Sequence, residues 1–273
     1  MRIITAILFT VILFAAALVS GRFVQAQSTA GPPSSLKFEV ASLKPTPPDA
    51  QPPFGIRPAP GGERYVASNV TLKVIMTVAF RVRDEQIAGG PDWINTLRYD
   101  MNAKAERPSS VEELHIMLQN LLIERFKLQF HHETKELPVY ALMVDKDGPK
   151  LEPHKAGSAG DPWIDQVSEQ FLHMVWHAKF APMDFFAWRL SLILDRPVID
   201  QTKLTGGYDF DLKFTRDLPP GVSEGALVNG AAIDTSGPTI FQAVRQQLGL
   251  KLESKKGPAD IIVIDHAEKP VEN

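Results

Sequence analysis

The chain of 273 residues contains no cysteine. This absence excludes disulfides, thiolate metal sites, cysteine nucleophiles and lipidated cysteines. Basic residues are not in excess either, since 29 Lys and Arg stand against 32 Asp and Glu. Phosphate binding depends on clustered Lys and Arg, so nucleic acid is not an expected partner. With 44% hydrophobic and 22% charged residues, the composition is that of a globular protein.

Catalytic signatures are also missing. The sequence has no serine-elbow, zinc-protease, phosphate-loop or dinucleotide-binding motif. We therefore predict no catalytic residue, no cofactor and no metal site. Enzyme activity stays uncertain, and a role without catalysis is favoured.

Only one apolar run is long enough to suggest a targeting segment. Arg2 is followed by an apolar run from Ile3 to Val19 and then by the small-residue pattern Val24-Gln25-Ala26, which predicts a signal peptide over residues 1–26 and export to the periplasm or beyond. Its removal takes away two arginines and no acid, which changes the net charge from −3 to −5. The run is shorter than the roughly 20 residues that span a bilayer, which favours a cleaved signal peptide. The alternative is an uncleaved N-terminal anchor, which would be the one expected contact with a membrane.

Two segments near the mature N-terminus have the composition of connectors. Residues 27–35 are small and polar and predict a flexible linker, after which the alternation over residues 36–40 predicts a strand. Residues 45–60 contain seven prolines and predict a loop. This loop is interpreted as a stiff connector, with a polyproline segment bound by a partner's aromatic groove as the alternative.

The most informative feature is an internal repeat. Apolar residues at helical spacing in residues 71–79 recur in residues 183–190, and the alternating segment 99–104 recurs as 208–213. A second apolar helix face follows in each half. Two strands are then expected to close each half, at residues 126–130 and 139–144 in the first and at residues 250–253 and 261–264 in the second.

The repeat predicts an α+β fold. The order strand-helix-strand-strand-helix-strand-strand occurs twice, so we expect two copies of one module packed as a pseudo-symmetric pair, over residues 36–150 and 160–273. The second copy carries an inserted loop at residues 215–237. A functional loop and a tolerated insertion are both open interpretations of this segment.

Several motifs together resemble a known family. They are FEVASLKP (38–45), GGPDW (89–93), RYD (98–100), ERFKL (124–128), LPVYAL (137–142), RPVID (196–200), LTGGYDF (204–210) and IDHAEKP (264–270). These motifs look like the "soil-associated" exported protein family of soil bacteria, a domain of unknown function, over nearly all of the mature chain. The resemblance implies that some relatives carry this region behind a membrane metallopeptidase of the antirepressor-sensor type, which suggests sensing at the envelope. The peptidase's zinc motif is absent from this chain.

A weaker resemblance concerns the repeat unit. Asn69-Val70-Thr71-Leu72 is similar to the start of the short helix in the periplasmic N-terminal modules of secretins and TonB-dependent receptors. Those modules are interaction domains, so the resemblance implies binding rather than chemistry.

Five residues are candidates for ligand binding. Trp93 follows a rigid turn and is interpreted as a surface contact or as a core residue. His173 and His177 lie on the polar side of an alternating segment, roughly 13 Å apart along a strand, too far to share a metal. Asp209 and Asp211 line the outward face of a predicted strand. They are interpreted either as part of a solvated face or as a paired-carboxylate site.

The leading hypothesis is an extracytoplasmic binding, sensing or interaction module for an unknown envelope protein or extracellular ligand. The alternative is an envelope-directed hydrolase whose histidine and carboxylate come together between the two repeats. A structural envelope component is a third hypothesis. Binding predicts an exposed apolar patch, whereas catalysis predicts a cleft with convergent titratable groups.

Overall fold

The computed structural model describes residues 35–51, 54–59, 62–155, 163–169, 171–223, 225–228 and 230–270. The predicted signal peptide and all but the last residue of the predicted linker lie outside the described residues. Helices and several sheets are present, which confirms the α+β fold class. No described helix has both the length and the apolar character needed to cross a bilayer.

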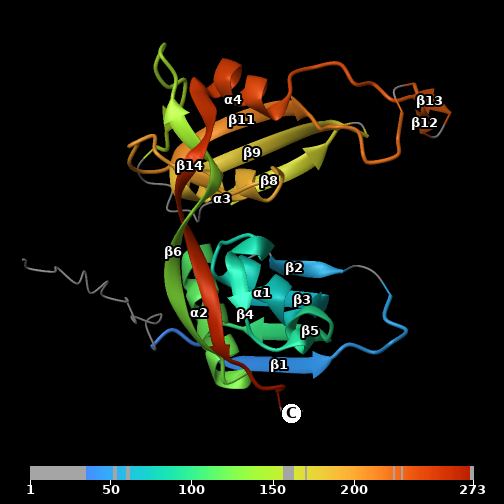
Figure 1. Cartoon of the computed structure of the whole chain (residues 1–273), viewed down its shortest axis with the longest axis vertical. Coiled ribbons are helices and arrows are strands. Elements are labelled where there is room, and N and C mark those ends of the chain that lie inside the picture. Colours follow the sequence, from blue (N-terminus) through green and yellow to red (C-terminus); the bar gives the residue numbers. More distant parts are fainter. Residues whose placement is uncertain are drawn as a thin grey trace, which may run out of the picture.

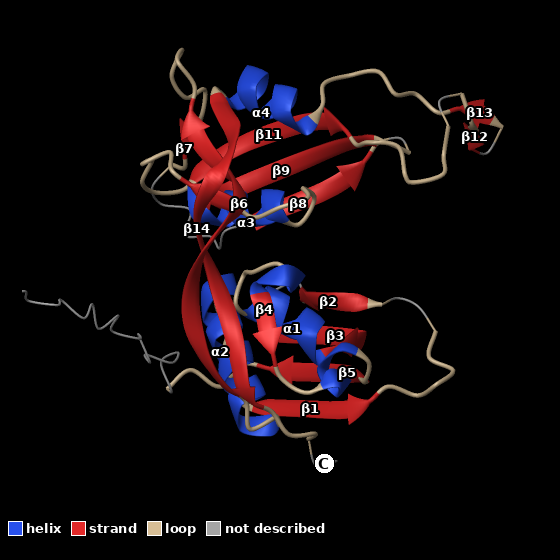
Figure 2. Ribbon diagram, viewed as in Figure 1, coloured by secondary structure: helices blue, strands red, loops and turns tan. Residues whose placement is uncertain are grey.

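The first lobe is a four-stranded antiparallel sheet in the order β1-β5-β3-β2, next to two helices (Figures 1 and 2). Its strands are β1 (Val40–Pro45), β2 (Gly55–Pro58), β3 (Arg64–Thr71) and β5 (Arg98–Lys104). Its helices are α1 (Leu72–Ala79) and α2 (Val111–Arg125), with short 3-10 turns η1 (Asp84–Gln86) and η2 (Asp92–Asn95).

The second lobe is built from a sheet in the order β7-β11-β9-β8 and two helices. Its strands are β7 (Glu152–Pro153), β8 (Trp163–Ser168), β9 (His173–Ala181) and β11 (Tyr208–Thr215), and its helices are α3 (Met183–Ser191) and α4 (Ile240–Leu248). The described residues within 216–238 form an arm that ends in the small hairpin of β12 (Leu227–Val228) and β13 (Ala231–Ala232). The arm projects away from the second lobe (Figure 1).

A ribbon of two long antiparallel strands joins the lobes. Strand β6 (Gln129–Val144) runs from the first lobe to the second, and β14 (Leu250–His266) runs back (Figure 2). Short parallel strands extend the ribbon at both ends, with β4 (Ile87–Gly89) beside β14 and β10 (Val198–Asp200) beside β6.

The expectation of two separate strands at the end of each half is therefore wrong. Pro138 and Pro258 do not end the strands, because the ribbon has only two strands at these positions and each strand has one open edge. A proline lacks only a donor, and an open edge tolerates that loss. The strand predicted over residues 36–40 is also misplaced, since β1 begins at Val40, and the predicted Pro-rich loop contains β2.

The ribbon makes each lobe depend on the other half of the sequence. Ile262 and Ile264 of β14 lie in the core of the first lobe, with Leu72, Phe126 and other residues of the first half. Leu142 of β6 lies in the core of the second lobe, beside Trp176. Each core is thus completed by the far end of a strand that starts in the other lobe.

The helices begin and end where local capping is satisfied. Thr71 caps α1 with its hydroxyl, and Ser110 and Thr239 form capping boxes at the starts of α2 and α4. The predicted apolar face of α1 is the buried one, as is that of α3. Gly249 ends α4 with a φ of 65°, a left-handed conformation that favours glycine.

The two lobes have the same kind of strand irregularity at equivalent positions. Asn69 in β3 and Phe180 in β9 both have positive φ angles, at irregularities where the register with the next strand shifts. Their N–H groups donate to Asp100 and Asp209 respectively, both at 2.8 Å. This correspondence agrees with the repeat in the sequence, while the duplication and its pseudo-symmetry stay predictions.

Candidate functional site

The first lobe contains a pocket of about 550 Å³ at the end of its sheet, which we call the first-lobe pocket. Its wall comes from the end of β1 and the loop after it, the irregularity in β3, the start of β5 and the C-terminal tail. The lining residues are Pro45, Thr46, Pro47, Pro48, Asn69, Thr96, Leu97, Arg98, Tyr99, Lys269 and Pro270. The volume lies in the range typical of small-molecule sites, about 300–1,000 Å³.

Asp100 holds the wall of this pocket together. One of its carboxylate oxygens, Oδ1, accepts hydrogen bonds from the Thr46 hydroxyl at 3.0 Å, the Asn69 N–H at 2.8 Å and the Ser68 hydroxyl at 3.4 Å. The Thr46 N–H also donates to the Arg98 carbonyl at 2.9 Å. Segments that are distant in sequence are thereby fixed around one cavity before any ligand arrives.

The charge of the pocket is one-sided. Arg98 and Lys269 line it, and no carboxylate among the described residues does. Within the residues that the structure describes, neither cation forms an ion pair. Arg98 donates from Nη1 to the Asn69 carbonyl at 2.9 Å. Both side chains are exposed and retain free donors.

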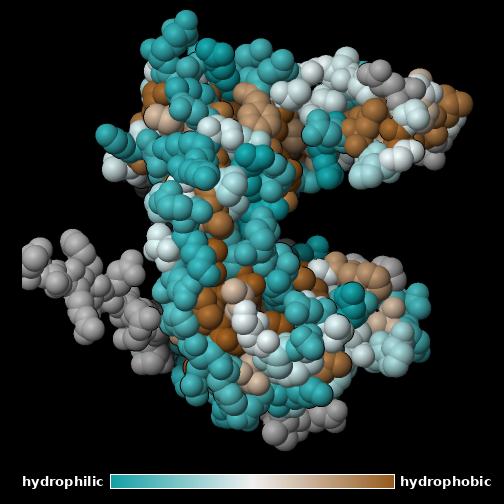
Figure 3. Space-filling model, in the orientation of Figure 1, coloured by the Kyte–Doolittle hydropathy of each residue, from teal (hydrophilic) through white to brown (hydrophobic). Residues whose placement is uncertain are grey.

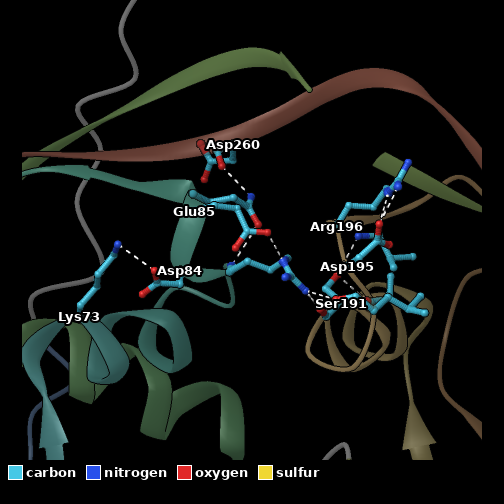
Figure 4. Close-up of polar contacts among 12 residues, drawn as sticks. Lys73, Asp84, Glu85, Ser191, Asp195, Arg196 and Asp260 are labelled. Atoms are coloured by element: carbon cyan, nitrogen blue, oxygen red, sulfur yellow. Dashed lines mark hydrogen bonds and ion pairs between the residues drawn. The ribbon is translucent and has the colours of Figure 1, made fainter. Parts of the chain in front are cut away.

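A second cluster lies where the lobes meet. The Arg83 guanidinium of the first lobe donates to the carbonyls of Ser191 and Leu194 at the end of α3 (Figure 4). Ser191 also accepts the Val198 N–H at 2.7 Å, which ties β10 to α3. Gln86 in η1 donates to the Asp260 carbonyl on the ribbon at 2.7 Å. These bonds join both lobes and the ribbon at one place.

His115 is buried beside this junction. Its Nδ1 lies 3.2 Å from Nε of Arg81, which can only donate, so Nε2 carries the proton and donates to the Tyr65 hydroxyl at 3.1 Å. The ring of Trp188 in the second lobe packs edge-on, with centroids 5.9 Å apart. Burial, followed by the positive charge of Arg81, lowers the pKa of His115 to about 3. Burial likewise raises the pKa of Tyr65.

The predicted binding residues on β9 and β11 share one face of the second sheet. His177 and Asp211 are cross-strand neighbours, with Nδ1 and Oδ1 2.7 Å apart. His173 lies 3.2 Å from Asp234, a residue of the arm. Asp209 holds the irregularity at Phe180, and this backbone hydrogen bond is the main cause of its lowered pKa. These are local pairs on a sheet surface, and none of the four lines the first-lobe pocket.

Trp93 lies apart from those four residues. It belongs to η2 in the first lobe, is half-buried, and packs on the core with its ring stacked on Phe126 at a centroid distance of 6.1 Å. The structure therefore brings four of the five predicted residues into one neighbourhood and places the fifth against the other core.

Other histidines pair with carboxylates across the ribbon. His131 Nδ1 lies 2.9 Å from Asp265, and its Nε2 lies 3.4 Å from Glu133; hydrogen bonding to Asp265 is the main cause of the raised pKa of His131. His132 Nδ1 lies 2.9 Å from Asp260. These pairs link the two halves of the sequence. No group of three or more histidine, aspartate or glutamate side chains among the described residues is arranged so that it could hold a metal ion.

The second lobe exposes apolar side chains. Ile193 is 37% exposed and Phe241 is 38% exposed, and both line a smaller pocket of about 230 Å³ between the end of α3 and the start of α4. Leu227 on the arm is 67% exposed. Figure 3 shows hydrophobic atoms at the end of the arm, which projects over a hollow between the lobes on the side away from the ribbon.

Sequence reasoning did not single out Arg98, Lys269, Arg83 or His115. Arg98 and Lys269 stood inside motifs that carried the family resemblance, which was the available signal. A lone arginine or histidine otherwise gives no indication of its spatial partners, since these come from distant segments.

The fold and the pocket define a two-lobed α+β protein whose lobes exchange their last strands. The chain belongs to the family described as protein of unknown function (DUF3738), whose model matches residues 73–267. Comparison with curated proteins and with solved structures gives no match.

Proposed function

We propose that this protein is an extracytoplasmic binding module and that its ligand occupies the first-lobe pocket. The observation that carries the proposal is the pocket itself, a cavity of about 550 Å³ with fixed walls and two cations without ion-pair partners among the described residues. A preformed cavity with few polar groups is the usual form of a small-molecule site.

The proposal extends to identity and location. We place the chain in the "soil-associated" exported protein family, on the motifs given above, and assign residues 1–26 as its signal peptide. Export is supported by the sequence alone and is tested by fractionating the native host. Recovery of the full-length chain with the cytoplasm, in the presence of a working secretion control, would contradict it.

Ligand binding is tested on the whole mature protein, residues 27–273. Small-molecule fractions of envelope extract are added, and the melting temperature is followed, because a ligand that binds only the folded state raises it. Thr96→Trp places a large ring in the pocket from an exposed position, whereas the exposed neighbour Asn95 does not line the pocket and Asn95→Trp serves as the control. We expect a shift for the native protein and for Asn95→Trp, and a loss of the shift for Thr96→Trp.

Two outcomes would contradict this assignment. An equal shift in all three proteins would place the ligand elsewhere, for example on the second-lobe pocket beside Phe241. Absence of any shift across all fractions, with all three proteins folded, would remove the support for a small-molecule ligand.

A hydrolase acting on envelope material is the second candidate function. It is supported by His131, which lies between Asp265 and Glu133 and thus combines a histidine and carboxylates from both halves of the sequence. A hydrolase screen of the native protein and of His131→Gln tests it. Hydrolysis that is retained in His131→Gln would exclude this site.

A further inference from the structure

The first-lobe pocket has a chemical character that narrows its ligand. Its lining includes Arg98 and Lys269 and, among the described residues, contains no carboxylate. Arg98 commits one donor to the Asn69 carbonyl, which holds its chain at the rim and leaves other N–H groups of the guanidinium free. A guanidinium presents paired donors that match a carboxylate or phosphate.

The positive charge at the first-lobe pocket is opposite in sign to the net charge of the protein. The whole chain is acidic, with a formal charge of −3, so its average field repels anions. Arg98 and Lys269 nevertheless line one cavity, and neither forms an ion pair with a described residue. Like-charged neighbours repel each other, and an anion between them would relieve that repulsion.

Much of the remaining wall is apolar, although Thr46, Asn69 and Thr96 also contribute to it. Four prolines line the pocket, together with the exposed side chain of Leu97 and the buried Tyr99. Proline has a fixed φ and little freedom to lose on binding, so the apolar wall is already organised for a flat or compact hydrocarbon body.

We infer that the pocket binds a small organic anion, in which a carboxylate or phosphate contacts Arg98 and Lys269 and an apolar body lies against the prolines. This inference rests on the proposed function and names the ligand class for the same site.

The test uses three probes with the same ring: benzoate, phenyl phosphate and the neutral benzamide. Binding to the full-length mature protein is measured by calorimetry at low ionic strength and again with added salt. We expect both anions to bind more tightly than benzamide, and binding to weaken as salt screens the pair of cations. The ratio of benzoate to phenyl phosphate affinity shows which oxyanion the site prefers.

Substitutions then locate the site. Arg98→Gln should weaken anion binding about tenfold, since a charge-assisted hydrogen bond is lost. Lys269→Gln should weaken it several-fold. Because Lys269 is exposed and forms no hydrogen bond or ion pair with the described residues, this variant should fold normally. Lys256, exposed on the ribbon, provides the matched control, and Lys256→Gln should leave binding unchanged.

The outcomes separate this inference from the proposed function. If benzamide binds as well as benzoate, or if both Arg98→Gln and Lys269→Gln bind anions like the native protein, the anionic class is wrong. The proposed binding function would still stand in that case if Thr96→Trp abolishes the shift with envelope extract. If the extract experiment fails as well, both proposals fall together.

Discussion

The buried histidine at the lobe junction makes stability depend on pH in a defined window. The pKa of His115 is lowered to about 3, first by burial and second by Arg81, whereas an unfolded histidine has a pKa of about 6.5. The unfolded chain therefore takes up the proton first as the pH falls. Stability contributed by neutral His115 is present above the unfolded pKa and is lost progressively as the pH falls toward the folded value.

The size of the effect follows from these two pKa values. Between about pH 7 and about pH 5, linkage gives a loss of about 2 kcal/mol for this one group. The window is useful because Asp and Glu titrate mainly below it, with unperturbed pKa values of about 4. The raised pKa of His131 also contributes to the pH dependence, so a difference between two proteins is required to isolate His115.

The assay is urea unfolding of the native protein and of His115→Gln at both pH values. Glutamine does not titrate and retains hydrogen-bonding groups for Tyr65 and Arg81, so the other histidines contribute equally to both proteins. We expect the native protein to lose about 2 kcal/mol more than the variant between the two pH values. An identical pH dependence in both proteins would refute the assignment of His115 as a buried neutral group.

Three further predictions concern structural residues. Gly89→Ala should lower the free energy of unfolding in urea by about 2 kcal/mol more than Gly206→Ala. Both glycines have positive φ angles, but only at Gly89 would a Cβ lie 2.7 Å from a carbonyl oxygen of β14. Equal losses of stability in the two variants would contradict this packing. Arg83→Ala should reduce stability by about 2 kcal/mol and speed amide exchange at the end of α3, whereas Arg57→Ala, an exposed control, should do neither. Asp209→Ala should lower the free energy of unfolding by about 1–2 kcal/mol, because the Phe180 N–H loses its acceptor. A variant with full stability but without ligand binding would instead indicate that Asp209 contacts the ligand.

The amino-acid sequence was sufficient to predict the helices and strands in which buried residues recur at a regular spacing. The apolar spacing in residues 71–79 predicted α1 and its buried face. The alternation that put His173 and His177 on the polar side of a strand predicted β9. Such patterns are readable because a helix or strand presents the same side to the core every 3.6 or two residues. The α+β class followed from the order of these elements.

The way the two halves combine depends on contacts between segments that are distant in the sequence. The sequence predicted two separate strands at the end of each half, because it does not show that an open edge lets one strand continue through Pro138 or Pro258. The pocket likewise joins Arg98 to Lys269 near the C-terminus, and the junction joins Arg83 to Ser191. These neighbours are set by β14 returning to the first lobe, and a contact between segments so far apart leaves no periodic trace in either segment.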